Sequence, residues 1–143
     1  MEELRGRSMS VRMVGDVLLV VHAKTDIDPD EWRTFCALAG KNRKARGSLR
    51  TLVISEGAAA PNAAQRAFYK EEVGSTNNRV AVLTDSVAAR TVLTAMSWFN
   101  PEMKPFAVAD VPGALRYLEV RETSALRDAI AELRVEHGLD PRR

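Results

Sequence analysis

The sequence contains few of the residues from which metal sites, disulfides and membrane spans are built. It has one cysteine and two histidines among 143 residues, too few for an internal disulfide or a Cys/His metal site. No apolar stretch approaches the roughly 20 residues that a bilayer requires. The charged N-terminus leads into no apolar segment of the kind that directs secretion. We therefore expect a cytoplasmic protein with no membrane span, metal or other cofactor.

A strong excess of one charge is also absent. Lys and Arg number 21 and Asp and Glu number 19, so the formal net charge is +2, too small for its field alone to recruit nucleic acid. The basic run at residues 41–50 has no interleaved aromatic residues, which favours a solvated helix end over a nucleic-acid patch. No glycine-rich phosphate-binding fingerprint follows a strand. We therefore expect no nucleic-acid partner and no bound nucleotide.

The sequence does contain a regular alternation of apolar strands with amphipathic helices. Gly15-Asp16 separates two short apolar runs and is typical of a tight hairpin turn. Strands are predicted at residues 11–14, 17–21, 49–54, 79–83 and 105–109. Helices are predicted at residues 29–43, 61–72 and 86–99, the first of them with Asp28 as its cap and Pro29 in its first turn. Two more helices are predicted after an Asp110 cap and after a Ser124 cap. This order predicts an α/β domain with a mixed, mostly parallel sheet of four to five strands, an N-terminal β-hairpin and helices packed on it.

A chain of this length suits one domain with one core. We predict an N-terminal tail at 1–8, the domain at 9–119, and an additional C-terminal helix, within 120–143, that packs on the same domain. Cys36 lies on the predicted helix at 29–43 and is interpreted as a small core residue rather than a reactive thiol.

Candidate binding residues follow two of the predicted strands. Ligands of open α/β sheets gather beyond the carboxyl ends of parallel strands. Ser55 and Glu56 precede a Gly/Ala-rich loop, whose small residues let a ligand or partner approach the backbone closely. We predict a protein- or ligand-binding site that comprises Ser55, Glu56, Gly57, Pro61, Asn62, Asp85 and Ser86. Asp85 and Ser86 also have a structural role open to them, as caps of the helix that follows.

An enzyme is an alternative interpretation of the same edge of the sheet. Ser55, His22 and Asp85 would form a hydrolase-type triad if they converged there. The Gly-x-Ser-x-Gly turn that exposes such a serine is missing. We therefore predict no catalytic residues and favour a non-enzymatic protein.

The predicted helix at 86–99 has one charged residue, Arg90. One of its apolar faces carries Val92, Ala95, Met96 and Phe99, and a second face carries Val87, Thr91, Thr94 and Trp98. A helix that is apolar nearly all round is covered on both sides. Either the last helix of the chain covers the second face, or that face is an interface with another subunit or a partner, where Trp is favoured as an anchor.

Several short motifs resemble one family of regulatory domains. They are Trp32, the strand Arg79-Val80-Ala81-Val82-Leu83-Thr84-Asp85, and Phe106 followed by Ala114-Leu115-Arg116-Tyr117-Leu118. Over about residues 9–119 the chain resembles the SpoIIAA-like, or STAS-type, superfamily, and most of all its small bacterial members.

The resemblance implies a protein-binding switch like the anti-sigma-factor antagonists, in which a serine at the start of the second helix is phosphorylated. Ser55 is the nearest match to that serine. The Asp-Ser-(Ser/Thr)-Gly pattern of the phosphorylated members is absent, and Ala58, Ala59 and Ala60 occupy the loop.

Three functional hypotheses follow from the sequence. The first is a non-enzymatic regulatory or scaffolding module that binds a protein partner through the 55–62 loop and the neighbouring helices, with a homodimer through Trp98. The second is a carrier of a small apolar or lipid-like ligand between the sheet and its helices. The third is the hydrolase that uses Ser55, His22 and Asp85.

Overall fold

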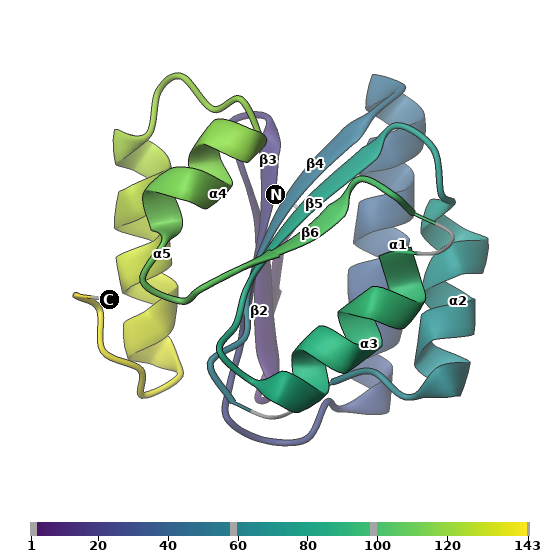
Figure 1. Ribbon diagram of the computed structural model, residues 1–143, viewed down its shortest axis with the longest axis horizontal. Helices are drawn as coiled ribbons and strands as arrows, with labels where there is room; N and C mark the ends of the chain where they lie inside the picture. The colour runs from purple at the N-terminus through teal and green to yellow at the C-terminus, as the bar shows by residue number, and fades with distance from the viewer. Residues whose placement is uncertain (1–2, 58–59, 98–99, 143) are drawn as a thin grey trace.

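A single six-stranded sheet organises the chain, with helices on both of its faces (Figure 1). The computed structural model describes residues 3–57, 60–97 and 100–142. Along the sheet the strands follow their sequence order: β1 (Glu3–Arg5), β2 (Met9–Val14), β3 (Val17–His22), β4 (Leu49–Ile54), β5 (Asn78–Leu83) and β6 (Met103–Phe106). Pairing is antiparallel from β1 to β3 and parallel from β3 to β6. The predicted N-terminal hairpin and mostly parallel sheet are confirmed.

The sheet has more strands than the predicted four to five, and the strand that has no counterpart in the prediction is β1. It lies inside residues 1–8, where the sequence predicts a tail, and it pairs Leu4 with Val11 of β2. Of its three residues only Leu4 is apolar. A segment this short has no alternation of apolar and polar residues from which a strand could be predicted. The backbone pairing with β2 is what orders this segment as a strand.

The helices divide between the two faces of the sheet. The crossover helices α1 (Pro29–Arg46), α2 (Ala63–Val73) and α3 (Val87–Ser97) lie on one face, and α4 (Val111–Tyr117) and α5 (Ser124–Glu136) lie on the other (Figure 1). Successive crossovers of the same hand between neighbouring parallel strands place their helices on one face. Because α5 packs against β2 and β3 on the opposite face from α3, the alternative that the last helix covers α3 is wrong.

Of the caps predicted for α1, α4 and α5, the first two are found. Asp28 accepts hydrogen bonds from the backbone N–H groups of Asp30 and Glu31, and Asp110 accepts one from Gly113. Ser124 does not cap α5, because its hydroxyl donates instead to the carboxylate of Glu122. The helix starts after Thr123 without a side-chain cap bond.

Alternating side chains of the strands build two separate cores. In β4, Leu49 and Val53 belong to the core under α1, α2 and α3, whereas Leu52 and Ile54 belong to the core under α4 and α5. Successive strand residues point to opposite faces, so a sheet covered on both faces has nearly continuous apolar strands. The buried run of β3, from Val17 to His22, follows this rule.

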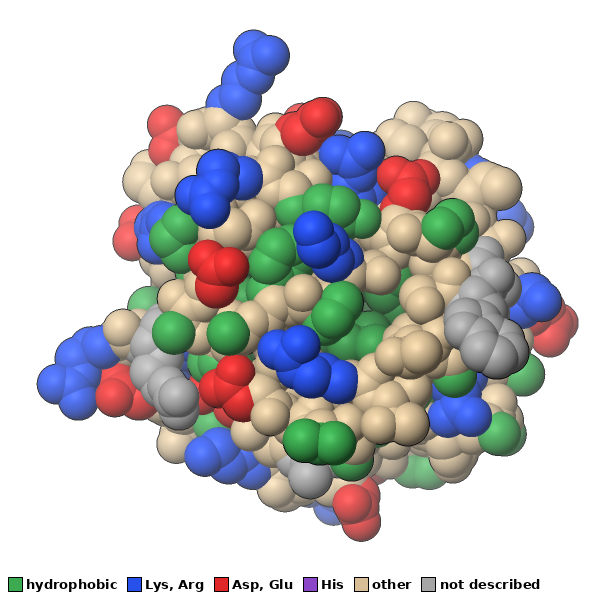
Figure 2. Space-filling model, in the orientation of Figure 1, with side chains coloured by type: hydrophobic (Ala, Val, Ile, Leu, Met, Phe, Trp, Pro, Cys, Tyr) green, Lys and Arg blue, Asp and Glu red, His purple; other side chains and the backbone are tan. Residues whose placement is uncertain are grey.

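The edge strand β6 crosses the centre of the face shown in Figures 1 and 2. Figure 2 shows hydrophobic side chains gathered in a hollow at the centre of this face, with Lys and Arg side chains beside them. Lys104 of β6 lies over the rings of Phe106 and Tyr117, with its ammonium group 5.5 and 5.6 Å from their centroids. A short edge strand that carries lysine and proline resists pairing with another sheet. Within the described part of the chain, no helix combines the length and apolarity needed to cross a bilayer.

Candidate ligand-binding pocket

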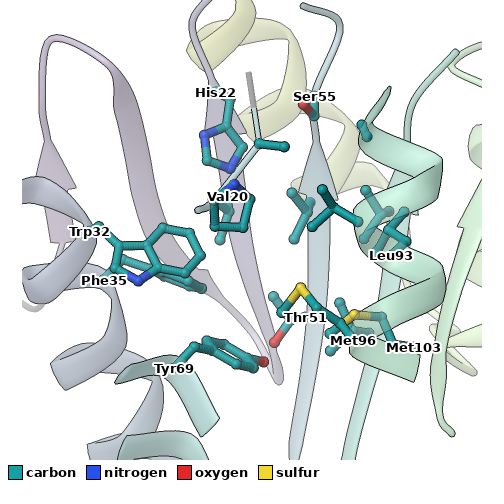
Figure 3. A pocket seen from close by; sticks show the side chains of 17 residues that line it. Val20, His22, Trp32, Phe35, Thr51, Ser55, Tyr69, Leu93, Met96 and Met103 are labelled. Carbon is teal, nitrogen blue, oxygen red and sulfur yellow. The ribbon is translucent and has the colours of Figure 1, made fainter. Parts of the chain in front are cut away.

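A cavity lies between the sheet and the helices α1, α2 and α3. Its volume is about 80 Å³, several times the 10–15 Å³ that one water molecule requires. Most of its lining is apolar and comes from segments far apart in the sequence, among them Val20, Trp32, Phe35, Tyr69, Leu93, Met96 and Met103 (Figure 3). Unbranched methionines repack readily around guests of different shape. The cavity is therefore suited to a small apolar group.

Three small polar side chains interrupt this apolar lining: His22, Thr51 and Ser55. Each is more than nine-tenths buried, with 6%, 1% and 5% of its surface exposed. The backbone positions of His22 and Ser55 lie side by side, because Val21 of β3 pairs with Ile54 of β4. Figure 3 shows these two residues at one end of the cavity and Thr51 at the other.

Two of these groups have unsatisfied hydrogen-bonding atoms. Among the described residues, neither Nδ1 of His22 nor Oγ1 of Thr51 has a hydrogen-bonding partner. A buried polar atom without a partner costs about 1–3 kcal/mol, and buried polar groups nearly always find one. Both atoms belong to side chains that line the cavity, so a molecule bound there is placed to supply the missing bonds.

Burial governs the ionisation of His22. Removal from water disfavours the charged ring, and the nearby His137 adds a smaller repulsion, so the pKa of His22 falls from 6.5 to about 4. The imidazole is therefore neutral at neutral pH, with one nitrogen that donates and one that accepts. A neutral imidazole suits an uncharged ligand.

The depressed pKa of His22 predicts a loss of stability on acidification. Above pH 6.5 the ring is neutral in both the folded and the unfolded chain, so it adds no pH dependence. Between pH 6.5 and about 4 the unfolded chain takes up a proton that the folded chain does not, so the free energy of unfolding falls by up to about 3 kcal/mol. Urea denaturation across this range, on the wild-type protein and on His22→Phe, measures the contribution. The variant should show the shallower decline, and equal declines would contradict the assignment.

The hypothetical catalytic triad of Ser55, His22 and Asp85 does not form in the structure. The carboxylate of Asp85 accepts a hydrogen bond from the backbone N–H of Val108 at 3.1 Å. Nδ1 of His22, the atom that such a carboxylate would orient, has no partner within the described structure. His22 and Ser55 share the cavity, but the three side chains do not form a hydrogen-bonded relay.

Among the other predicted binding residues, one lines the cavity and three have structural roles. Pro61 lines the cavity together with Ala60. The side chain of Asn62 caps α2 by accepting from the N–H of Gln65, and Ser86 accepts from the N–H of Ala89 in the first turn of α3. Asp85, predicted as a second cap of α3, instead holds the loop after β6.

Gly57 and Glu56 fit closely against other parts of the chain. A Cβ atom at Gly57 would lie 3.1 Å from the backbone of Lys24, so a larger residue would displace one of the two segments. The carboxylate of Glu56 lies 3.4 Å from Nε of Arg134 on α5, and both side chains are buried. This ion pair joins the loop after β4 to the last helix.

The sequence predictions include neither Arg134, which forms the buried ion pair, nor Thr51, whose hydroxyl belongs to the cavity. Arg134 is fully buried, and a signal for it exists, because it follows Ile130 by four residues on the apolar stripe of its helix. A charge on such a stripe indicates a buried partner. Thr51 shares the face of Leu49 and Val53, which places its hydroxyl toward the cavity.

The predicted interface face of α3 is only partly described. Val87, Thr91 and Thr94 are exposed, and Val87 retains 79% of its surface. Trp98, the proposed anchor, lies outside the described residues. The hydroxyls of Thr91 and Thr94 donate to backbone carbonyls of their own helix.

Cys36 belongs to the core, as predicted. Its side chain is fully buried, and burial raises the pKa of its thiol to about 12. A thiol in this state is a poor nucleophile. Within the described structure, no three His, Cys, Asp or Glu side chains are close enough together to hold a metal ion.

Comparison with known proteins gives one match. Searches of curated proteins and of solved structures found nothing similar. A family model described as SpoIIAA-like matches residues 18–119, a range that begins at the second residue of β3 and includes β4 to β6 and helices α1 to α4. This range contains all of the described side chains that line the cavity. The chain, with its mixed sheet and its crossover helices on one face, belongs to the SpoIIAA-like family.

Proposed function

We propose that this SpoIIAA-like domain is a non-enzymatic regulatory module that binds a small apolar molecule in the cavity between its sheet and α1 to α3. The observation that carries the proposal is the cavity itself, an apolar space with unsatisfied polar atoms in its wall. Ligand sites are typically concave and mostly apolar, with a few polar groups that fix the orientation of the ligand. The proposal includes a cytoplasmic location and no resident cofactor.

The cavity is connected to the loop that the sequence predicts as a binding loop. Ala60 and Pro61, which line the cavity, belong to the loop between β4 and α2. This loop follows the carboxyl end of a parallel strand, where open α/β sheets bind their ligands. A bound molecule therefore contacts the segment that the sequence predicts as the binding loop. In this proposal, the ligand sets the conformation that the loop presents to other molecules.

Filling the cavity should weaken ligand binding. Ala89 of α3 is buried and lines the cavity, so Ala89→Leu places three additional carbon atoms in the space that the ligand would occupy. We expect the affinity for hexanol, measured by titration calorimetry, to fall at least tenfold, which is about 1.4 kcal/mol. Filling a cavity commonly preserves or raises stability, so the variant should melt no lower than the wild type.

Ala88→Leu is the matched control for this prediction. Ala88 precedes Ala89 on the same helix and is exposed, so the same substitution there adds the same carbon atoms outside the cavity. It should leave hexanol binding unchanged. Equal binding by the wild type and both variants would place any bound hexanol elsewhere on the protein.

A protein partner is a second candidate function, and the exposed face of α3 favours it. The resemblance to STAS-type regulatory domains implies a protein partner, and the proposed site consists of the 55–62 loop and this face. Val87, a large apolar residue with 79% of its surface exposed, is the kind of side chain that a second subunit covers. A second copy of this chain is the partner that we propose.

Light scattering after size exclusion tests the second candidate. If α3 forms a homodimer, Val87→Asp should shift the protein from dimer to monomer, because a carboxylate would be desolvated in the interface. Val135→Asp is the control, since Val135 is also exposed, at 59%, but lies on α5 on the opposite face of the sheet. A wild-type monomer would exclude the homodimer.

A further inference from the structure

The lining of the cavity carries no charged side chain among the residues that the structure describes. Its polar members are His22, Thr51, Ser55 and the hydroxyl-bearing Tyr69, and its remaining members are apolar. The hydroxyl of Tyr69 already accepts a hydrogen bond from the side-chain amide of Asn78 at 2.8 Å. A carboxylate or an ammonium group that entered this space would lose its hydration and meet no opposite charge.

Thr51 marks the enclosed end of the cavity. It is 1% exposed and lies near Tyr69, Met96 and Met103 (Figure 3). His22 and Ser55 occupy the other end (Figure 3). Ala60 and Pro61, which also line the cavity, are half-buried. Ser55 follows Thr51 by four residues in the same extended segment, so the two ends are about 13 Å apart. One polar group on a small ligand therefore meets one end or the other.

The two unsatisfied atoms, Oγ1 of Thr51 and Nδ1 of His22, belong to uncharged groups that form hydrogen bonds with neutral partners. The hydroxyl of Thr51 both donates and accepts, and so does a neutral imidazole across its two nitrogens. A hydroxyl or a carbonyl oxygen on the ligand would satisfy either of them. A site that is built to hydrogen-bond a hydroxyl discriminates against the analogue that lacks it, because its own buried group is then left unsatisfied.

We propose that the ligand of this cavity is an uncharged amphiphile, with an apolar body between the sheet and α3 and a hydroxyl or carbonyl group that bonds Thr51 at the enclosed end. A second polar group on a longer ligand would meet His22 and Ser55. This inference rests on the proposed function, because it names the chemical class of the molecule that the cavity binds.

Three probes of the same chain length test the charge preference: hexanol, hexanoate and hexylamine, titrated into the intact protein at neutral pH by calorimetry. We expect hexanol to bind at least tenfold more tightly than either ion. Hexanoate or hexylamine that binds as tightly as hexanol would overturn the inference while the proposed function stands. No saturable binding by any of the three probes would remove the proposed function as well.

A substitution series at Thr51 tests the residue assignment. Thr51→Val keeps the shape of the side chain and removes its hydroxyl, so the affinity for hexanol should fall about five- to tenfold, the worth of one neutral hydrogen bond. Thr51→Ser keeps the hydroxyl and should retain most of the affinity. Thr91→Val is the control, because the hydroxyl of Thr91 is exposed and bonds the carbonyl of Val87. Equal affinity for hexanol in Thr51→Val and the wild type would refute the role of Thr51.

Discussion

Arg134→Met should lower the free energy of unfolding by about 3–5 kcal/mol, the usual effect of removing one partner of a buried ion pair. The guanidinium and the carboxylate of Glu56 are 0% and 3% exposed, with Nε and Oε2 3.4 Å apart. Methionine fills similar space but leaves a buried carboxylate without this cation. Urea denaturation at neutral pH, monitored by far-ultraviolet circular dichroism, measures the loss.

The double variant Glu56→Gln/Arg134→Met separates charge from packing. It removes both charges together, so no lone ion is buried, and replacing both partners of such a pair is often close to neutral. We expect it to recover most of the stability that Arg134→Met loses. A double variant as unstable as Arg134→Met would contradict the electrostatic explanation and indicate that contacts of the guanidinium other than this ion pair determine its effect.

Trp32→Ala should cost a similar amount, about 3–5 kcal/mol. The indole is 5% exposed, packs edge-on against Phe35 with 5.2 Å between ring centroids, and donates from Nε1 to the carbonyl of Gln65 at 2.9 Å. It therefore fills the core beneath α1 and also bonds the first turn of α2. Equilibrium unfolding in urea gives the size of the effect.

Trp32→Phe divides that cost between packing and hydrogen bonding. Phenylalanine retains an aromatic ring in the core but cannot donate to the carbonyl of Gln65, so we expect a smaller loss, about 1–3 kcal/mol. Because Trp32 also lines the cavity, both variants should weaken ligand binding. Trp32→Phe as unstable as Trp32→Ala would show that the hydrogen bond, rather than the volume of the ring, dominates.

Where local patterns carry the signal, the fold is predictable from the sequence. Gly15 adopts a φ of 58°, as the hairpin signal Gly15-Asp16 requires. Asp28 and Pro29 begin α1 as capping chemistry predicts. The helix continues to Arg46, beyond the predicted end at 43, because Gly47 supplies the left-handed residue that terminates it.

Other boundaries depend on contacts between distant residues. The strand predicted at 105–109 is found at Met103–Phe106, since pairing with β5 selects the earlier residues. Val108 is also apolar and buried, but it lies after the strand. Its N–H donates to the carboxylate of Asp85 instead of pairing with β5. Apolar character alone does not distinguish these two situations.

The candidate site was predictable only in part, because the cavity is assembled from many segments. Ser55 and Pro61 do lie at it, as expected for residues after a parallel strand. Thr51 lies within a strand, where threonine is a common residue, so the sequence indicates no functional role for it. That its hydroxyl is unsatisfied depends on α2, α3 and β6 together, and such a property has no sequence signature.

Methionine methyl resonances show whether the cavity between the sheet and α1 to α3 takes up a small uncharged molecule. Met96 and Met103 line the cavity, whereas Met13 does not and is half-buried on β2. With methyl-labelled methionine, titration with hexanol should shift Met96 and Met103 saturably and leave Met13 in place. Shifts of equal size at Met13, Met96 and Met103, or none at Met96 and Met103, would show that hexanol does not bind in the cavity.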